Sequence, residues 1–185
     1  MTDPQEGTLD WFFDTVVIHD LGKMINEANL HYLSFSPMAT TVELLGAIYN
    51  DFDDFHVNGK SKARFNKALQ TIPSLNPYAQ YVKSAHDLYT NFRCGMVHVG
   101  LPGDGVVFTQ RSDLNDGRRH LSKDRYNGTL RLILVCENLY EDIVNAITHV
   151  RNDQNKPRNL TTPFMNPHLL PDSAPVSTST PNASG

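Results

Sequence analysis

Apolar residues recur every three or four positions in four separate segments of this chain, and that spacing constrains the fold more than any other feature. Side chains at this spacing return to one side of an α-helix, so each segment can bury one apolar face. The pattern predicts helices over about residues 9–28, 36–52, 76–98 and 125–150. Four such helices favour an all-α helical bundle, which is the fold class that the sequence predicts.

Helix starts are marked by Ser–Pro and Asn–Pro pairs. Ser36 and Asn76 can each cap a helix with a side-chain oxygen, and the proline that follows suits the first helical position. Ser61 is expected to cap a short additional helix, "SKARFNKAL". Further on, "VVFTQ" and "RRHL" flank the polar segment "RSDLNDG", so we expect either a small β-hairpin or a structured loop as an insertion before the last helix.

Composition divides the 185-residue chain into three parts. The last part holds six of the eleven prolines together with many Ser, Thr and Asn. Such a segment buries too little apolar surface to offset its conformational entropy. We therefore expect a disordered N-terminus over residues 1–7, one helical domain over residues 8–151 and a disordered tail over residues 152–185.

Charge and cysteine content narrow the classes of protein. The formal net charge of −4 argues against a protein that coats nucleic acid by charge alone, because that needs a basic surface. Cys94 and Cys136 both lie in apolar helical contexts, so a disulfide is not indicated and a reducing cytoplasm is expected. No apolar run approaches the roughly 18 residues that cross a membrane, so no membrane partner is expected.

A histidine–aspartate step raises one alternative. The segment "VVIHDLGK" is similar to the His-Asp-x-Gly-Lys step of HD-type metal phosphohydrolases. That family places another histidine well upstream, whereas no histidine precedes His19 here. A metal site needs several ligands that converge from different helices. We therefore interpret His19, Asp20 and Lys23 as the polar face of the first helix, and we expect no metal site and no cofactor.

The segment "LYTNFRCGMVHVG" places Arg93 and His98 near the end of the third predicted helix. In an ideal α-helix, two residues five positions apart lie about 140° apart around the axis. An arc of mixed polarity joins the two on the side away from the apolar stripe. The residues on this arc include Asp87, Thr90 and Cys94. The pair either stabilises the carbonyl groups of a helix C-terminus or forms a chemical site.

The same segment resembles the signature helix of the HEPN superfamily, small all-α proteins marked by an arginine, four to six residues and a histidine. The resemblance extends over roughly residues 36–150, through "TTVELLGAIYND", "SKARFNKAL" and "YAQYVKSAHDLYTNFRCGMVH". This layout is similar to that of bacterial HEPN-like proteins of unassigned role. It implies a homodimer whose facing Arg–His pairs form, in active members, a metal-independent endoribonuclease site. On this resemblance Arg93 and His98 are the catalytic residues.

The residue types suit that chemistry. Cleavage by the ribose 2′-OH needs a proton acceptor, a proton donor and positive charge on the phosphate. Histidine transfers protons near neutral pH, and the planar fork of arginine matches phosphate oxygens. A two-fold axis would bring two copies of each residue into one cleft and so supply both proton-transfer roles.

The residue after the arginine departs from the family pattern. Active members often carry Asn, Asp or His there, whereas this chain has Cys94, and a thiol is a weak hydrogen-bonding group. Two functions therefore stay open. The first is an endoribonuclease in RNA processing, toxin or defence roles. The second is a non-catalytic homodimer that binds RNA, a nucleotide, or a protein partner such as an antitoxin. A helical protein without a ligand is the third interpretation.

Further residues are candidates to support the pair. Glu43 lies on a helix side with small residues, which lets another helix approach closely, so it can orient Arg93 or remain a solvated glutamate. Asp87, Thr90 and Cys94 are supporting candidates because they share the arc between Arg93 and the histidine.

Three arginines, Arg118, Arg119 and Arg125, are candidates for contacts with RNA phosphates. They lie in the predicted insertion and at the start of the last helix, where aspartates interrupt them. An ordinary charged surface segment is the alternative interpretation, and no aromatic stacking platform accompanies the three arginines.

Overall fold

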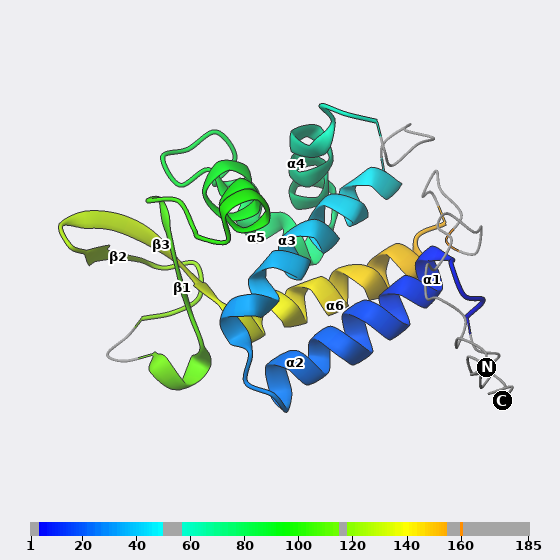
Figure 1. Cartoon of the computed structure of the whole chain (residues 1–185). Coiled ribbons are helices and arrows are strands. Elements are labelled where there is room, and N and C mark those ends of the chain that lie inside the picture. Colours follow the sequence, from blue (N-terminus) through cyan, green and yellow to red (C-terminus); the bar gives the residue numbers. More distant parts are fainter. Residues whose placement is uncertain (1–3, 50–56, 115–117, 155–159, 161–185) are drawn as a thin grey trace, which may run out of the picture.

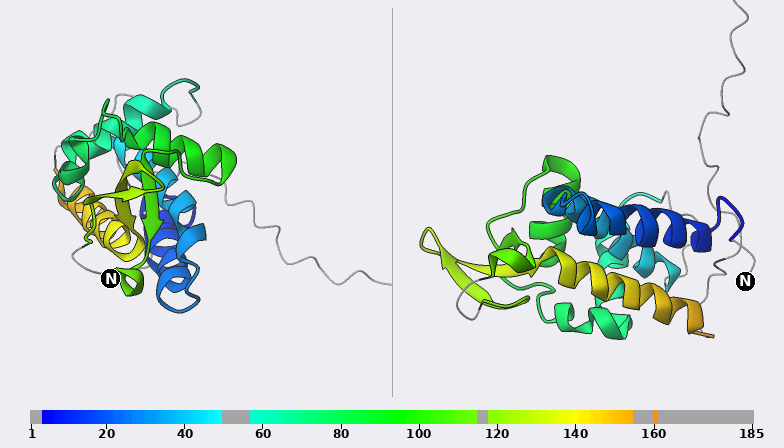
Figure 2. Two further views of the ribbon diagram at one scale, coloured as in Figure 1. Left: turned by 90° about the vertical axis from the view of Figure 1, so that its left-hand side faces the viewer. Right: turned by 90° about the horizontal axis from the view of Figure 1, so that it is seen from below.

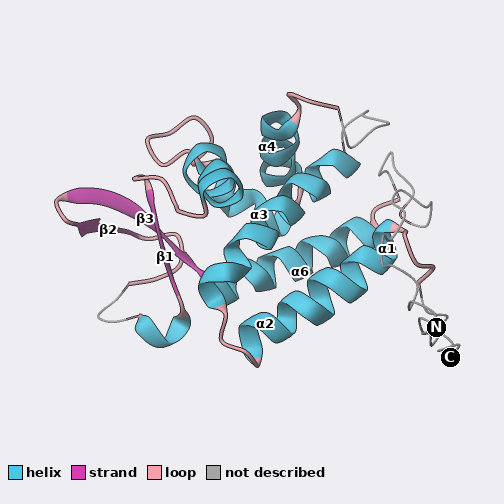
Figure 3. Ribbon diagram, viewed as in Figure 1, coloured by secondary structure: helices cyan, strands magenta, loops and turns pink. Residues whose placement is uncertain are grey.

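The computed structural model describes residues 4–49, 57–114, 118–154 and 160 of the chain (Figure 1). These residues form a mixed α/β fold that is mainly helical. Six α-helices and a three-stranded mixed sheet are found among the described residues. The prediction of an all-α bundle is therefore wrong, because part of the last predicted helix is a strand. Figure 3 shows the strands gathered at one end of the molecule.

The N-terminal helical segment runs from Leu9 to Asn26. It comprises α1 (Leu9–Trp11), the π-helix η1 (Phe12–Leu21) and α2 (Gly22–Asn26). Its buried side chains lie every fourth residue, at Leu9, Phe13, Val17, Leu21 and Ile25. In a pure α-helix such a stripe would drift by about 40° per step. The wider π-helical turn, closed by bonds between residues five apart, keeps the stripe on one side.

Helix α3 (His31–Ile48) begins before the predicted cap at Ser36, and Pro37 lies inside it. Proline removes one N–H from the helical ladder. The hydroxyl groups of Thr40 and Thr41 donate to the Pro37 carbonyl at 2.9 and 2.8 Å. The prediction of a helix start at Ser36 is wrong because this proline occupies a helix interior rather than a first turn.

Helix α4 (Ser61–Thr71) packs closely on α3. A Cβ atom at Gly46 of α3 would lie only 1.7 Å from the carbonyl oxygen of Arg64. The contact therefore requires glycine at this position. The short helix predicted here is confirmed, although Lys60 rather than Ser61 occupies its N-cap position.

The third predicted helix is broken into two parts. Helix α5 (Asn76–Ala79) ends after one turn, and the π-helix η3 (Tyr89–Val99) follows a run of turns. The Asp87 carboxylate accepts hydrogen bonds from the backbone N–H groups of Lys83 and Thr90, both at 2.9 Å. Such local side-chain bonds compete with the helical ladder, which explains why the helix does not continue.

The sheet comprises β1 (Val106–Thr109), β2 (Lys123–Tyr126) and β3 (Thr129–Val135), in the order β1-β3-β2. Strand β1 pairs in parallel with β3, and β2 pairs antiparallel to β3. Asn127 and Gly128, both with positive φ, form the tight turn between β2 and β3. The hairpin predicted from "VVFTQ" and "RRHL" is wrong, because the hairpin lies further along the chain.

Helix α6 (Cys136–Asn152) begins later than predicted. The preceding segment "TLRLILV" forms β3, and its last four residues are fully buried. A short continuous apolar run fits a buried strand as well as a buried helix, so its periodicity does not distinguish the two.

Helix α3 packs against both α4 and α6, and the N-terminal segment lies beside α6 (Figures 1 and 2). The N-terminal segment and α6 run antiparallel. Tyr140 of α6 donates to the Ile18 carbonyl at 2.8 Å, and Arg151 donates to Asp14 at 2.6 Å. No helix among the described residues combines the length and the apolar composition needed to cross a membrane.

The expected disordered ends fall largely outside the described residues. Inside the expected tail, Leu160 is described and is 3% exposed. Its carbonyl accepts a hydrogen bond from the Asp10 N–H at 3.2 Å. The core of the domain therefore includes at least one residue beyond position 152.

Candidate functional site

Arg93 and His98 meet on one side of η3. The Arg93 Nη1–H group donates to His98 Nε2 at 3.1 Å. Bonds between residues five apart close a π-helix, so residue i+5 lies about one turn above residue i. The 140° separation of an ideal α-helix therefore does not apply here. Because Nε2 accepts, the neutral imidazole of His98 carries its proton on Nδ1 in this contact.

Glu43 of α3 holds the other side of Arg93. The Arg93 Nε–H group donates to Glu43 Oε2 at 2.7 Å, and the two side chains are only 11% and 14% exposed. Gly46, one turn along α3, allows the close packing of α4 on this helix. His98, by contrast, is exposed. The pair thus joins a fixed cation to an imidazole that solvent reaches.

The Cys94 thiol forms a hydrogen bond with the Tyr89 hydroxyl. Burial and a hydrogen bond with the Cys94 thiol raise the pKa of the Tyr89 hydroxyl. The Tyr89 ring lies 5.8 Å from Arg93 Cζ and 5.6 Å from Lys62 Nζ, within the range of cation–π attraction. Two cations, Arg93 and Lys62, therefore lie against the Tyr89 ring near His98.

A pocket of about 190 Å³ opens between α3, α4 and η3. Its lining residues are Thr40, Glu43, Leu44, Ala47, Arg64 and Arg93. Sequence reasoning did not select Arg64, which is 3% exposed. A signal was present, because this arginine precedes Phe65 on the buried side of a short amphipathic helix. Two guanidinium groups beside one carboxylate give a pocket suited to an anion.

Asp87 and Thr90 support the helix rather than the pair. Burial opposes ionisation of Asp87, but the N–H groups of Thr90 and Lys83 and the charge of Lys62 outweigh it and lower its pKa. Thr90 is exposed and contributes its N–H group to this cap. Both residues therefore fix where η3 begins.

The loop after His98 is held on η3 by Asn91. The N–H groups of Gly103 and Gly105 donate to the backbone and side-chain oxygens of Asn91 at 2.8 and 3.0 Å. A Cβ atom at either glycine would lie within 2.8 Å of the Asn91 side chain. Gly103 and Gly105 thus permit the contact that holds this loop against the first turn of η3.

The three arginines expected to contact RNA lie around β2. Arg118 Nε donates to Asp124 at 2.6 Å, and Arg125 Nη1 donates to the Gly128 carbonyl at 3.1 Å. Arg119 is exposed, and its N–H group donates to Ser122. These contacts stay within the segment around the hairpin and do not connect it to Arg93 and His98.

The His-Asp step lies on the polar side of the N-terminal segment. His19 Nδ1 is 2.8 Å from Asp20 Oδ1, and both side chains are exposed. Gly22 is buried because the Tyr140 ring packs over it. The step therefore has a structural explanation in the helix contact with α6.

A buried polar network also escaped sequence reasoning. The Val135 N–H group donates to His120 Nδ1 at 2.9 Å, so the neutral ring carries its proton on Nε2. His120 Nε2 lies 2.7 Å from the Tyr78 hydroxyl, which donates to Asp142 Oδ2 at 2.7 Å. The network connects α5, α6 and the end of β3. Tyr78 and Asp142 lie 64 positions apart in the sequence, so no local pattern indicated the network.

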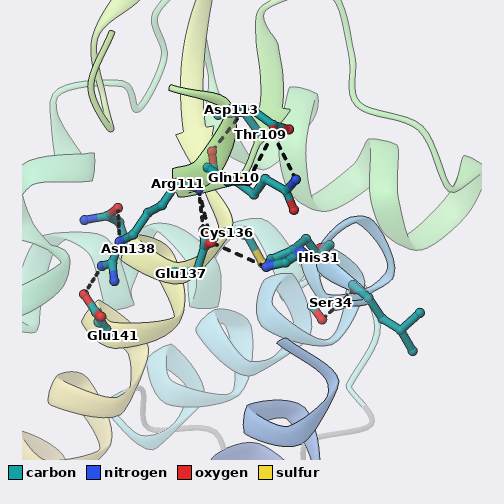
Figure 4. Close-up of polar contacts among 12 residues, drawn as sticks. His31, Ser34, Thr109, Gln110, Arg111, Asp113, Cys136, Glu137, Asn138 and Glu141 are labelled. Carbon is teal, nitrogen blue, oxygen red and sulfur yellow. Dashed lines mark hydrogen bonds and ion pairs between the residues drawn. The ribbon is translucent and has the colours of Figure 1, made fainter. Parts of the chain in front are cut away.

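A second polar cluster joins the start of α3 to the start of α6 (Figure 4). His31 Nε2 lies 3.4 Å from Glu137 Oε1, and both Glu137 oxygens accept from the Arg111 N–H group at 3.1 Å. Arg111 also donates to Asn138 at 3.2 Å and to Glu141. These contacts fix the turn that follows β1.

Known proteins do not decide among these sites. Comparison of the chain with protein-family models, curated proteins and solved structures finds no match in any of the three. Function must therefore be argued from the geometry of the molecule itself. The pair of Arg93 and His98, with Glu43 behind it, is the arrangement that combines a cation with an exposed proton-transfer group.

Proposed function

We propose that the chain is a metal-independent endoribonuclease of the HEPN type that acts through Arg93 and His98. One observation carries the proposal: Arg93 Nη1 contacts His98 Nε2 at 3.1 Å while Glu43 fixes Arg93 Nε at 2.7 Å. A positioned cation and an imidazole at one point are the two groups that cleavage by a ribose 2′-OH needs. Arg64, which lines the same pocket, adds positive charge for the phosphate.

The reaction follows from these groups. When the phosphate draws the Arg93 guanidinium away from the ring, His98 Nε2 becomes free to take the proton of the 2′-OH, and the oxygen attacks the adjacent phosphorus. Arg93 stabilises the charge that develops on the phosphate oxygens. The bond to the 5′-oxygen breaks, and that oxygen receives a proton. The products are a 2′,3′-cyclic phosphate and a 5′-hydroxyl.

A homodimer completes the site in this proposal, because a second His98 supplies the proton that the leaving oxygen needs. Exposed apolar side chains at the end of η3 and near the start of α3 support such an interface. Val99, Leu101 and Leu33 are 70%, 60% and 59% exposed. The second copy would cover these side chains and bring the two pairs together. Both cysteines are free, which suits a cytoplasmic protein in RNA processing, toxin or defence roles.

The alternative is a non-catalytic dimer that binds RNA, a nucleotide or a protein partner. The ion pair with Glu43 favours it, because the carboxylate cancels part of the charge that Arg93 offers to a phosphate. Cys94, in place of a small polar residue, favours it as well. This alternative retains Arg93-dependent binding without cleavage.

The test is incubation of the purified protein with mixed RNA in EDTA, beside His98→Ala and Arg93→Ala. We expect cleavage by the wild type in chelator and none by either variant, since each removes one of the two required groups. His19→Ala is the matched control, because this exposed histidine lies on another helix. If the RNA stays intact but still binds in an Arg93-dependent way, the endoribonuclease proposal is wrong and the non-catalytic binding dimer is supported.

A further inference from the structure

A second pocket lies between the start of α3 and the end of β1, and its lining differs from that of the Arg93 pocket. Its volume is about 300 Å³, at the small end of the range for ligand sites. Six of its lining residues bear on the inference: Asn29, Tyr32, Phe35, Phe108, Gln110 and Asp113. A pocket of this size and lining suits one flat, polar-edged group rather than a polymer or a large cofactor.

Aromatic rings form one wall of this pocket. The Phe35 and Phe108 rings stack with centroids 3.9 Å apart and an angle of 10° between their planes. Tyr32 meets Phe108 edge to face at 6.1 Å and is 44% exposed. Half-exposed aromatic rings are the platforms on which proteins stack nucleic-acid bases.

Amide and carboxylate groups form the polar wall of the pocket, together with His31, whose Nε2 lies 3.4 Å from Glu137 Oε1. Gln110 Nε2 donates to Asp113 Oδ1 at 3.0 Å (Figure 4), and the Ser112 hydroxyl donates to the same oxygen at 3.1 Å, so both bonds orient the carboxylate. The bonds of Arg111 to Glu137 and Asn138 hold this turn on α6. The polar wall is thus fixed before a ligand arrives, which reduces the entropy lost on binding.

The Asp113 carboxylate disfavours phosphate and favours a hydrogen-bond donor. An ionised carboxylate only accepts hydrogen bonds and repels an anion. The Watson–Crick edge of guanine presents two neighbouring N–H donors to such a carboxylate, whereas the same edge of uracil presents one. The Arg93 pocket, with its two arginines, suits the phosphate instead.

Tyr32 connects the two pockets. Its hydroxyl donates to the Gly100 carbonyl at 2.9 Å, two residues beyond His98. Phe92, the neighbour of Arg93, lies 6.1 Å from the Phe35 ring and 5.7 Å from the Phe108 ring. The aromatic wall therefore rests on the same helix that carries the Arg–His pair.

We propose that this pocket binds one base of the RNA strand, with guanine preferred, and so selects the nucleotide near the cleaved phosphate. The inference rests on the proposed ribonuclease function for its role in cleavage, but base binding itself can be measured apart from cleavage. Tyr32 supplies the stacking surface, and Asp113 reads the edge of the base.

The test is fluorescence anisotropy with labelled 2′-O-methyl oligonucleotides UUGUU, UUAUU and UUUUU. These lack the free 2′-OH and are not cut. We expect UUGUU to bind at least about fivefold more tightly than UUUUU, since stacking and edge contacts both differ. Asp113→Asn should remove the preference for guanine over adenine. Tyr32→Ala should weaken both purine oligonucleotides by about fivefold or more, whereas Tyr32→Phe, which keeps the ring, should retain their affinity.

Asp20→Asn, a change of another exposed aspartate, is the matched control and should leave all three affinities unchanged. Equal wild-type affinities, an unchanged preference in Asp113→Asn, or no binding of any oligonucleotide would overturn the proposal. The failure of each proposal is distinct. If unmethylated RNA stays intact but UUGUU is preferred, the nuclease fails and the base pocket stands. If RNA is cut but the three affinities are equal, the base pocket fails alone.

Discussion

The guanidinium group of Arg93 is held by three neighbours of different chemistry. Glu43 accepts from Nε, His98 accepts from Nη1, and the Tyr89 ring lies 5.8 Å from Cζ. A planar fork held at several points loses little more freedom when it meets a phosphate. At the scale of the residue, the function of Arg93 therefore depends on the partner that fixes it.

Replacement of Glu43 by Gln tests this dependence. The amide can still accept from Arg93 Nε but carries no charge, so we expect Arg93 to be less firmly held. Removal of a charge-assisted bond costs about 1.5–3 kcal/mol. We expect kcat for RNA cleavage to fall about tenfold or more, with a smaller change in KM, in steady-state assays. Glu27→Gln, an exposed change just after α2, is the control. A kcat equal to that of the wild type would contradict the positioning role.

His120 makes stability depend on pH. Burial, with the charge of Arg111, lowers its pKa from 6.5 to about 4. Between these two pKa values the unfolded chain binds more protons than the folded chain. The contribution of the neutral His120 ring to stability is therefore fully present above about pH 6.5 and decreases as the pH falls below it. At pH 5.5 the loss is about 1.4 kcal/mol. Burial of Asp142 raises its pKa, which acts in the opposite sense and offsets part of the loss in the acidic range.

Chemical denaturation at pH 7.5 and pH 5.5 measures this effect. We expect the free energy of unfolding of the wild type to be smaller at pH 5.5. The variant His120→Gln removes the titrating ring, so the difference between the two pH values should shrink by about 1.4 kcal/mol. An unchanged difference in the variant would exclude His120 as its source.

At the scale of the element, the π-helical geometry of η3 brings Arg93 and His98, five positions apart, into contact. The sequence allowed Arg93 and His98 to be selected, because the residue types and the five-residue interval are visible in it. It did not allow their geometry to be predicted, since an α-helical wheel separates the two. Arg64 was missed because it lies in a short helix whose buried side holds few residues.

Some elements of secondary structure could be predicted from the sequence and others could not. The N-terminal segment and most of α6 could be predicted because their apolar residues recur over many turns. Strand β3 could not, because "LILV" is buried throughout and has no period of its own. Its pairing with β1 depends on residues about 26 positions away, as in the register of Val106 with Leu132. Tyr32 and Asp113 of the second pocket lie still further apart in sequence, so this pocket had no local signal.

The contact of α3 with α4 sets the position of Glu43 and predicts the effect of one substitution. A Cβ atom at Gly46 would lie 1.7 Å from the Arg64 carbonyl oxygen, so Gly46→Ala must push the two helices apart. Overpacking of this kind costs about 1–3 kcal/mol or more. We expect a lower Tm in thermal unfolding. Gln70→Ala, an exposed change on α4, should leave Tm nearly unchanged, and equal Tm values for both variants would contradict the close contact.

At the scale of the whole molecule, the chain beyond α6 returns to the N-terminal segment. Leu160 is buried, and its carbonyl accepts from the Asp10 N–H group. Burial of a leucine side chain contributes about 1.5–3 kcal/mol. We expect a chain that ends after Asp153 to unfold at a lower Tm than the full chain, and a chain that ends after Thr162 to match the full chain. Equal Tm values for the two truncations would show that Leu160 contributes nothing.

Cleavage by the ribose hydroxyl at the Arg93–His98 pair is the central proposal for the whole molecule, and mass spectrometry of the RNA ends tests it most directly. A single RNA oligonucleotide is incubated with the protein in EDTA, and the masses of the fragments are compared with those from His98→Ala. With the wild type we expect one fragment that ends in a 2′,3′-cyclic phosphate and one that begins with a 5′-hydroxyl, and with the variant we expect intact oligonucleotide. Fragments that end in a 3′-hydroxyl and a 5′-phosphate, or equal cleavage by His98→Ala, would contradict the proposal.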